Sequence, residues 1–209
     1  MNPADPSSTS AGPTGSGARR RPGRLTVLGG MAAVGAVIAV ADQLTKNWAE
    51  ATLPLLDPQP FLGEFLQLTL LYNSGAAWGL GAEITPVVTG VQILIVLGVI
   101  VFALRAVRSL WYTLAFGLIL GGALGNIHDR LLRPPGPFHG EVVDFLELPH
   151  WPVFNVADMA VVGGAILVVL LGIIGHAPDP VADAAERAAG AAATEQAQDG
   201  EQAQDGDAR

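Results

Sequence analysis

Residues 154–174 read FNVADMAVVGGAILVVLLGII, and this run decides the fold class. Apart from Asn155 and Asp158 near its start, the run is apolar. As a helix it would extend roughly 32 Å at about 1.5 Å per residue, which matches a hydrocarbon core of about 30 Å. It therefore predicts a helix that crosses a membrane.

Three other runs have the same character, at residues 25–46, 84–104 and 110–127. Helices in soluble cores seldom continue for this length with so little charge. Half of the chain is hydrophobic and only 14% is charged, which is the composition of a membrane protein. We therefore predict a mainly α, polytopic membrane protein with four transmembrane helices.

The first run admits a second interpretation. Arginines before it and the residues Ala39-Val40-Ala41 near its end are typical of a cleaved secretory signal. Asp42 and Lys46, however, lie one turn apart in the order that stabilises a helix, so they favour a continuous span.

The two ends of the chain differ from its middle. Residues 1–24 are rich in Pro, Gly, Ser and Thr, and residues 177–209 are rich in Ala, Gln, Asp and Glu. Neither end buries enough apolar surface to offset the entropy of ordering, so we predict two disordered tails around a membrane domain at 25–176. The net charge of −8 lies partly in the second tail, and no basic patch with aromatic residues indicates a nucleic-acid partner.

Basic residues predict the orientation of the spans, because cytoplasmic flanks carry an excess of Lys and Arg. Arginines cluster before the first span and between the second and third, at 19–21, 24, 105 and 108. Both termini are therefore predicted to be cytoplasmic. Segments 47–83 and 128–153 would face the outside.

The first outer segment contains a strand pattern. Over residues 65–72, apolar side chains alternate with Gln67 and Thr69, as in a half-buried β-strand. Prolines at 54, 58 and 60 mark turns ahead of it. We expect a small extracytoplasmic β-sheet that lies on the membrane surface.

Polar clusters fall at the outer ends of the spans or in the outer segments. They read DQLTK at 42–46, NSGAAWG at 73–79, GGALGNIHDR at 121–130, VVDF at 142–145 and FNVAD at 154–158. Because successive spans alternate in direction, these clusters should meet at one depth near the outer leaflet. This convergence predicts a functional site.

The acidic residues of these clusters have different surroundings. Asp144 and Asp158 lie among apolar residues, where desolvation favours the protonated form, and two such groups placed together can share one proton. One carboxylate would then activate water as a general base while the other donates a proton, as in an aspartic peptidase. Asp42 has Lys46 one turn away and is predicted to be a paired structural charge. Asp129 precedes Arg130, with Arg133 nearby, so pairing should keep it ionised at the end of the third span, and it is the reserve catalytic candidate.

Neighbouring polar and small residues have two interpretations. Asn73, Asn126 and Asn155 could orient a peptide or the acids, and Gly75 and Ala76 leave room for a substrate backbone. A tight turn after the strand explains the latter equally well. Gly121, Gly122 and Gly125 have the spacing of close helix packing.

Other chemistries have less support. The chain has no cysteine, and its four histidines lack the spacing of a zinc peptidase, so neither a metal nor another cofactor is expected. A Ser74–Lys46 dyad has no supporting motif. A small four-helix transporter for protons or cations, or a scaffold in which the acids only join helices, are the competing classes.

The five polar motifs, in this order, resemble those of lipoprotein signal peptidase, also called signal peptidase II. The resemblance implies an aspartic endopeptidase of the bacterial cytoplasmic membrane. It would remove signal peptides from prolipoproteins, cutting before a cysteine that carries a diacylglyceryl group, in contact with membrane lipids. The family's catalytic pair maps onto Asp144 and Asp158, and its other important positions map onto a set that includes the doubtful Asp129: Asp42, Lys46, Asn73, Gly122, Asn126, Asp129, Arg130 and Asn155.

Overall fold

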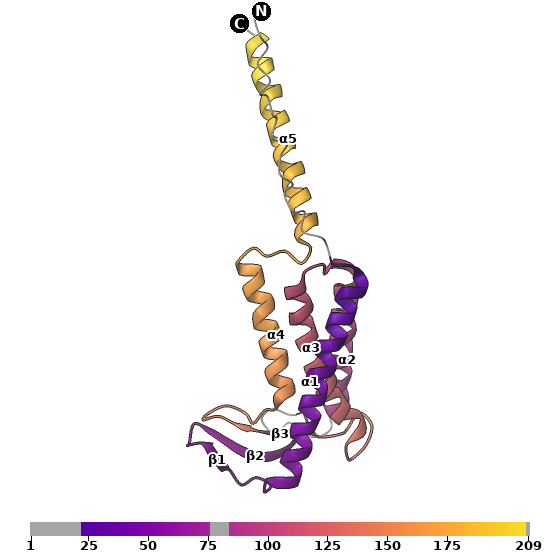
Figure 1. Cartoon of the computed structure of the whole chain (residues 1–209), viewed down its shortest axis with the longest axis vertical. Helices are drawn as coiled ribbons and strands as arrows, with labels where there is room; N and C mark the ends of the chain where they lie inside the picture. The colour runs from indigo at the N-terminus through magenta and orange to yellow at the C-terminus, as the bar shows by residue number, and fades with distance from the viewer. Residues whose placement is uncertain (1–21, 76–83, 208–209) are drawn as a thin grey trace, which may run out of the picture.

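The computed structural model describes residues 22–75 and 84–207 of the chain. Ala76, one of the predicted site residues, lies outside this part. The elements in chain order are α1 (Arg24–Thr52), β1 (Gln59–Leu62), β2 (Leu66–Asn73), α2 (Thr85–Ala106), α3 (Leu110–Leu132), β3 (Val142–Glu147), α4 (Val156–Ile173) and α5 (Pro180–Asp207). Figure 1 shows α1 to α4 side by side, with the sheet at one end of the bundle and α5 beyond the other.

Helices α1, α2, α3 and α4 are long and apolar enough to cross a membrane, which confirms the four predicted spans. Two of them continue further than their apolar runs. Helix α1 extends past Lys46 to Thr52, and α3 extends to Leu132, because these polar turns are buried against other elements rather than in lipid. Ala49, for example, is fully buried under the sheet.

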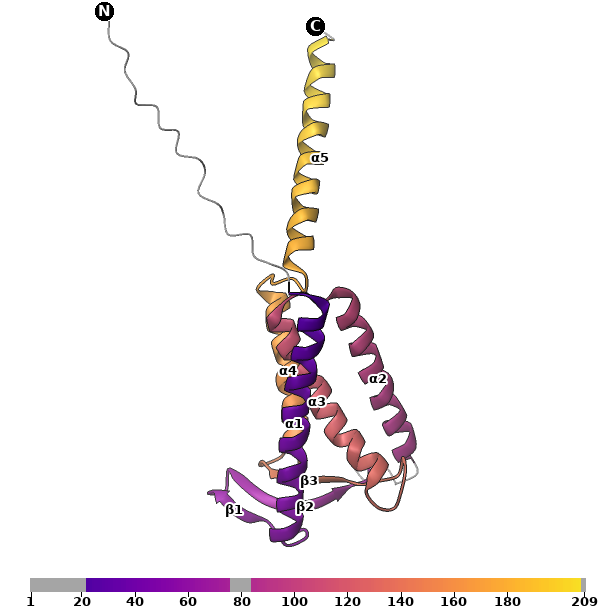
Figure 2. The same cartoon turned by 45° about the vertical axis from the view of Figure 1, so that its right-hand side comes forward.

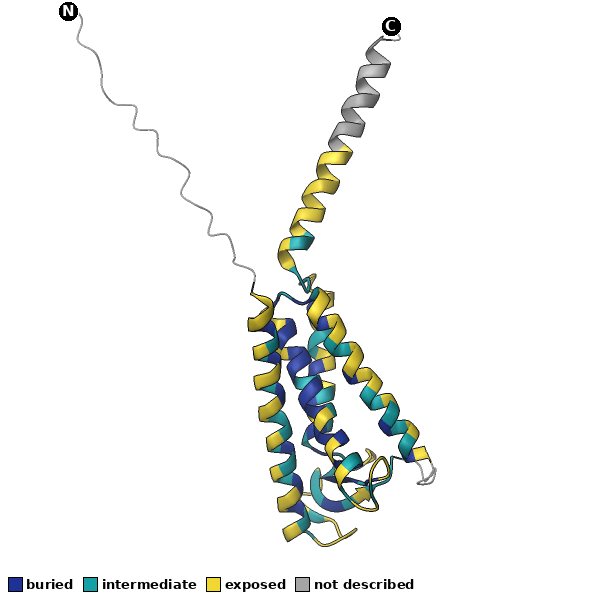
Figure 3. Cartoon of the chain, turned by 90° about the vertical axis from the view of Figure 1, so that its right-hand side faces the viewer, coloured by how far each residue is buried: buried dark blue, intermediate teal, exposed yellow. Residues whose placement is uncertain are grey.

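Helix α3 is the central helix of the bundle. Over its apolar window 61% of residues are buried, against 17–22% for the other three spans, and Figure 3 shows this contrast in colour. It packs on α1 and α4 through glycines. A Cβ on Gly121 would lie 2.7 Å from the Gly35 carbonyl oxygen of α1, and one on Gly122 would overlap the carbonyl oxygen of Ala157 in α4. Close backbone approach is how helices associate in lipid, where no hydrophobic force drives them together.

Helix α2 covers a different side of α3. It packs through Val96 and Ala103, which are buried, and diverges from α1 toward the sheet end, as Figure 2 shows. A cavity lined by residues of α2, α3 and α4 lies toward the sheet end of the bundle.

The sheet is antiparallel in the order β1-β2-β3. Strand β2 confirms the strand predicted at 65–72. One face packs on the end of α1 through Leu70, Val143 and Phe145. The sheet therefore holds β3, with Asp144 near its middle, against the ends of the helices.

In the C-terminal tail, which the sequence predicts to be disordered, residues Pro180–Asp207 form α5. Its composition offers little apolar surface to bury, but it is rich in Ala, Glu and Gln, which favour helix strongly. Residues 1–21 of the other tail lie outside the described part.

Glycine packing in α4 leads to a test with two adjacent residues. A Cβ on Gly164 would lie 2.7 Å from both the Ala115 carbonyl oxygen and Ile119 Cγ1, whereas a Cβ on Gly163 meets nothing within 4 Å. Gly164→Ala is expected to destabilise the protein by about 1–3 kcal/mol through overpacking. Gly163→Ala is the control and should not lower the free energy of unfolding. Thermal unfolding in detergent, followed by tryptophan fluorescence, measures both, and equal melting temperatures would contradict the packing.

Candidate active site

Asp144 is held from two sides by amide groups. It lies in β3 opposite Leu71 of β2, so Asn73, two residues further along β2, faces the same side of the sheet. Asn73 Nδ2 donates to Asp144 Oδ2 at 2.8 Å, and Asn155 Nδ2 donates to Oδ1 at 2.6 Å. Asp144 is 1% exposed, and each of its carboxyl oxygens is held by one of these hydrogen bonds.

Asp158 is positioned by the start of α4. Asn155 is the N-cap: its Oδ1 accepts from the Asp158 backbone N–H at 3.0 Å, and Asp158 Oδ2 accepts from the Asn155 N–H at 3.2 Å. This reciprocal capping box satisfies two free N–H groups of the helix end. The same Asn155 side chain thus contacts Asp144 with its amide nitrogen and the Asp158 backbone with its oxygen.

Asn126 of α3 joins this pair to the helix bundle. Its Nδ2 donates to Asp158 Oδ1 at 2.8 Å, while its Oδ1 accepts from Lys46 Nζ at 2.9 Å and from Asn155 Nδ2 at 3.1 Å. Because two donors occupy the oxygen, the amide must turn its nitrogen toward Asp158. Lys46 therefore sets the orientation of a group that holds Asp158.

Lys46 is fully buried and has three acceptors for its three N–H bonds. Besides Asn126, these are Asp42 Oδ2 and Asp129 Oδ2, each at 2.8 Å. Asp42 Oδ1 also accepts from the backbone N–H of Ala157 at 3.0 Å, so it binds the N-terminus of α4. A Cβ on Gly125 would lie 2.5 Å from Asp42 Oδ2, which explains a glycine at that position.

Asp129 is more completely paired than any other acid near the site. Besides Lys46, it accepts from Gln43 Nε2 and Arg133 Nε, both at 2.9 Å. These contacts stabilise its charged form. Asp129 does not line the cavity described next. The structure places Asp129 with Asp42 among the paired acids rather than with Asp144; its cationic partners are Lys46 and Arg133, and not the adjacent Arg130.

Asp144 and Asp158 line one cavity of about 200 Å³, together with Asn73, Asn126 and Arg130. Burial, and next the nearby charge of Asp158, raise the pKa of Asp144 to about 7. The hydrogen bonds from Asn73 and Asn155 oppose this rise without cancelling it. Near neutral pH the Asp144 carboxyl group in this cavity can therefore carry a proton.

Arg130 brings a positive charge to the same cavity. It is 3% exposed, and its Nη1 donates to the carbonyl oxygens of Asn73 at 2.7 Å and Gly140 at 3.0 Å. Within the described residues it forms no ion pair, and its buried Nε has no hydrogen-bond partner. Gly75, with a φ of +97°, lets the chain pass Arg130, since a Cβ there would lie 3.0 Å from Nη2. The Gly75 N–H donates to Asn73 Oδ1, so the chain at Gly75 both forms a turn and passes close to the Arg130 side chain.

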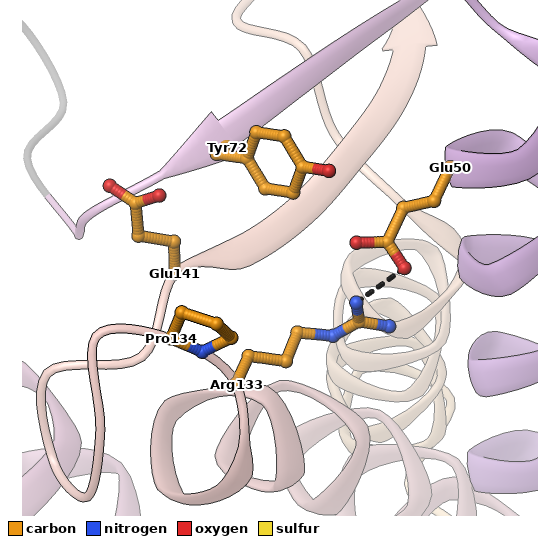
Figure 4. Close-up of a pocket in the computed structure, with 5 residues that line it drawn as sticks. All are labelled: Glu50, Tyr72, Arg133, Pro134 and Glu141. Carbon is orange, nitrogen blue, oxygen red and sulfur yellow. Dashed lines mark hydrogen bonds and ion pairs between the residues drawn. The ribbon is translucent and has the colours of Figure 1, made fainter.

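A second hollow lies on the other side of this end and has a structural role. Figure 4 shows its lining, in which Arg133 reaches from the end of α3 to Glu50 of α1, and the Tyr72 hydroxyl points toward Glu50. The Arg133–Glu50 ion pair measures 2.5 Å. Arg133 also forms an ion pair with Asp129, so both of its carboxylate partners belong to the protein itself. The Arg133–Glu50 pair joins α1 to the end of α3 beneath the sheet.

Sequence reasoning missed two glutamines. Gln43 binds Asp129 and the Gly125 carbonyl oxygen, and Gln92 of α2 lines the cavity of the two acids. A signal for Gln92 was available, because it is the one amide side chain in the run at 84–104.

The fold and the cavity define a class: a polytopic membrane protein whose buried acidic and amide groups gather at one end of its helices. Residues 34–174 match the family described as Signal peptidase (SPase) II. The chain is 46% identical to the lipoprotein signal peptidase of Mycobacterium avium over 171 residues, covering 81% of this chain and 92% of that one. It is 42% identical to that of Mycobacterium tuberculosis H37Rv, covering 85% and 88%.

A bacterial membrane enzyme solved by the in meso method has a similar structure, with a TM-score of 0.62 and 30% identity. The alignment covers 68% of this chain and 92% of that one. The chain belongs to the signal peptidase II family, and it is a multi-pass membrane peptidase. The resemblance noted in the sequence is confirmed.

The raised pKa of Asp144 predicts a pH-dependent stability. The folded state binds this proton more tightly than the unfolded chain does, where the pKa is near 3.8. The stabilisation is therefore complete below about pH 4 and is lost as the pH rises to about 7. Asp144→Asn cannot ionise, so its stability relative to the wild type should increase by on the order of 4 kcal/mol between pH 4 and pH 8. Thermal unfolding across this range, with exposed Asp57→Asn as control, measures it. A pH-independent difference would contradict the assignment.

Asp129→Asn should have the opposite effect. It leaves buried Lys46 with one carboxylate instead of two and removes one of the two carboxylates that pair with Arg133. Breaking a buried ion pair from one side costs about 3–5 kcal/mol. Unfolding at pH 8 should therefore occur at a lower temperature than for the wild type. An unchanged melting temperature would show that Asp129 is not a structural partner.

Proposed function

We propose that this chain is an aspartic endopeptidase that removes signal peptides from bacterial prolipoproteins. The bond cut would lie directly before a cysteine that carries a diacylglyceryl group. Family membership supports lipoprotein processing. The observation that carries the aspartic mechanism is the shared cavity, in which the charge of Asp158 helps to raise the pKa of Asp144 to about 7.

In this mechanism the two acids have different roles. Asp158 lies in the first turn of α4, where the helix dipole and the Asn126 amide stabilise a negative charge, so it is the general base. Asp144 carries the proton. Asp158 removes a proton from a water molecule, whose oxygen attacks the scissile carbonyl carbon, while Asp144 donates its proton to the carbonyl oxygen.

The second half of the reaction returns both protons. The tetrahedral diol collapses as Asp158 donates its proton to the leaving nitrogen, and Asp144 takes one back from a diol hydroxyl. The C–N bond breaks, the peptide with a free amine leaves, and the pair returns to one proton in total. Arg130, which lines the cavity without an ion pair in the described part of the chain, provides positive charge near the developing oxyanion.

An adjoining cavity suits the hydrophobic part of such a substrate. It measures about 270 Å³ and lies between α2, α3 and α4, with an apolar lining of Ile95, Ile119, Ala123, Val161 and Val162. Asn126 and Asp158 line both cavities. A precursor that is lipidated beside the cut would place apolar groups here while its scissile bond lies between the acids.

The membrane placement belongs to the same proposal. The arginine distribution supports cytoplasmic termini, with 25–176 as the peptidase domain and 47–83 and 128–153 on the outer side. The acids then lie near the outer leaflet of the cytoplasmic membrane, where the precursor arrives. A proton- or cation-coupled transporter remains the weaker alternative, because the family is one of peptidases and the acids gather at one end of the bundle.

The test replaces each acid by its near-isosteric amide. Asp144→Asn and Asp158→Asn should each lower cleavage of a diacylated precursor at least about 100-fold, because each removes one half of the proton transfer. Purified enzyme in detergent, with a chelator present, is assayed by gel shift of the precursor. Asp57→Asn, an exposed acid ahead of β1, should retain full activity. Cleavage that survives in both Asn variants would reject the catalytic pair.

A further inference from the structure

Gln92 is the one amide side chain of α2, and it lies where the two cavities meet. It lines the polar cavity with Asp144 and Asp158, and it lines the apolar cavity with Ile95 and Val162. In both it comes from α2, across from Asp158 of α4. Asn126 is the third residue that lines both cavities, so a substrate that reaches from one cavity into the other passes these three side chains.

The Gln92 side chain is incompletely satisfied. Its Oε1 is buried and accepts no hydrogen bond from any residue that the structure describes. The other amides of the site differ, because the oxygens of Asn73, Asn126 and Asn155 all accept a hydrogen bond within the protein. A buried carbonyl oxygen without a donor lowers stability, and such a group in a native structure needs an explanation.

The chemistry of the missing partner is restricted. A buried oxygen needs a hydrogen-bond donor, and the ester groups of a diacylglyceryl moiety contain only acceptors. A peptide backbone offers N–H groups at regular spacing. The side chain amide of Gln92 presents a carbonyl oxygen and an NH₂ group together, which complements the N–H and C=O of an extended peptide.

We propose that Gln92 is a positioning residue that accepts a hydrogen bond from a backbone N–H of the precursor beside the scissile bond. The inference rests on the proposed function and adds a specific substrate contact to it. Gln92 would hold the peptide from the α2 side, so that the scissile carbonyl faces the acids on β3 and α4. A backbone N–H of the substrate would then supply the hydrogen bond that Gln92 Oε1 lacks among the described residues of the free enzyme.

The experiment compares Gln92→Met, which keeps the length and removes the amide, with the wild type. The substrates are diacylated precursor peptides in which one backbone amide at a time, on either side of the cut, is replaced by an ester. Each ester removes a single N–H and keeps the chain length. Leu97→Met, on an exposed position of α2 outside both cavities, is the matched control.

Three results are expected together. Gln92→Met should lower kcat/KM for the all-amide precursor about tenfold, while Leu97→Met leaves it unchanged. At one position the ester should cost the wild type about tenfold and the Gln92→Met enzyme nothing further. The melting temperature of Gln92→Met should equal or exceed that of the wild type, because the substitution removes an unpaired buried oxygen.

Two outcomes would overturn the inference. One is an unchanged kcat/KM in Gln92→Met, or ester effects that are the same in both enzymes at every position. The other is a loss of activity together with a lower melting temperature, which would assign Gln92 to folding. Failure of the proposed function looks different, since a wild type that leaves the diacylated precursor uncut, as Asp144→Asn does, would show it.

Discussion

The contact on which the site depends is the buried ammonium group of Lys46 between two carboxylates. Its three N–H bonds go to Asp42, Asp129 and Asn126, so one side chain of α1 reaches two residues of α3. Asp42 then binds the first turn of α4 through the Ala157 N–H. A charge buried in this way is costly unless every bond is satisfied, and here each one is. Three helices are thereby held at fixed positions at the end where the reaction would occur.

This arrangement explains why Asp129 and Asp144, which are both buried, have different properties. Asp129 accepts from a lysine, an arginine and a glutamine, and all three contacts favour its charge. Within the part of the chain that the structure describes, Asp144 accepts only from the neutral amides of Asn73 and Asn155, in an equally buried position. Neutral donors compensate less for lost hydration than cations do, and the charge of Asp158 adds repulsion. The pKa of Asp144 therefore rises to about 7.

Most of the fold could be predicted from the sequence, because each of the four spans is a long apolar run that hydropathy detects. The strand at 65–72 could also be predicted, because its apolar and polar side chains alternate. Strand β3 could not, because Val142–Glu147 is buried at its first four positions and therefore lacks alternation. Hydropathy also failed to predict the last turns of α1 and α3, after Lys46 and Ile127. Their polar residues are paired across the bundle, which no local pattern records.

For the candidate site, the sequence indicated which residues converge but not how they are connected. Alternating spans bring the five polar motifs to one end, and local context separated Asp129 from Asp144. The pairing of Asn126 with Lys46 and the contact of Asp42 with α4 depend on how closely the helices approach. That approach is set by glycines such as Gly121, Gly122 and Gly125, which bring backbones within reach of short side chains. In lipid, where apolar burial cannot hold helices together, this packing and the Lys46 contacts must offset the cost of keeping Asp144 and Asp158 close to each other. The ion pairs of Asp42 and Asp129 thus help to stabilise the arrangement that places Asp144 and Asp158 in one cavity.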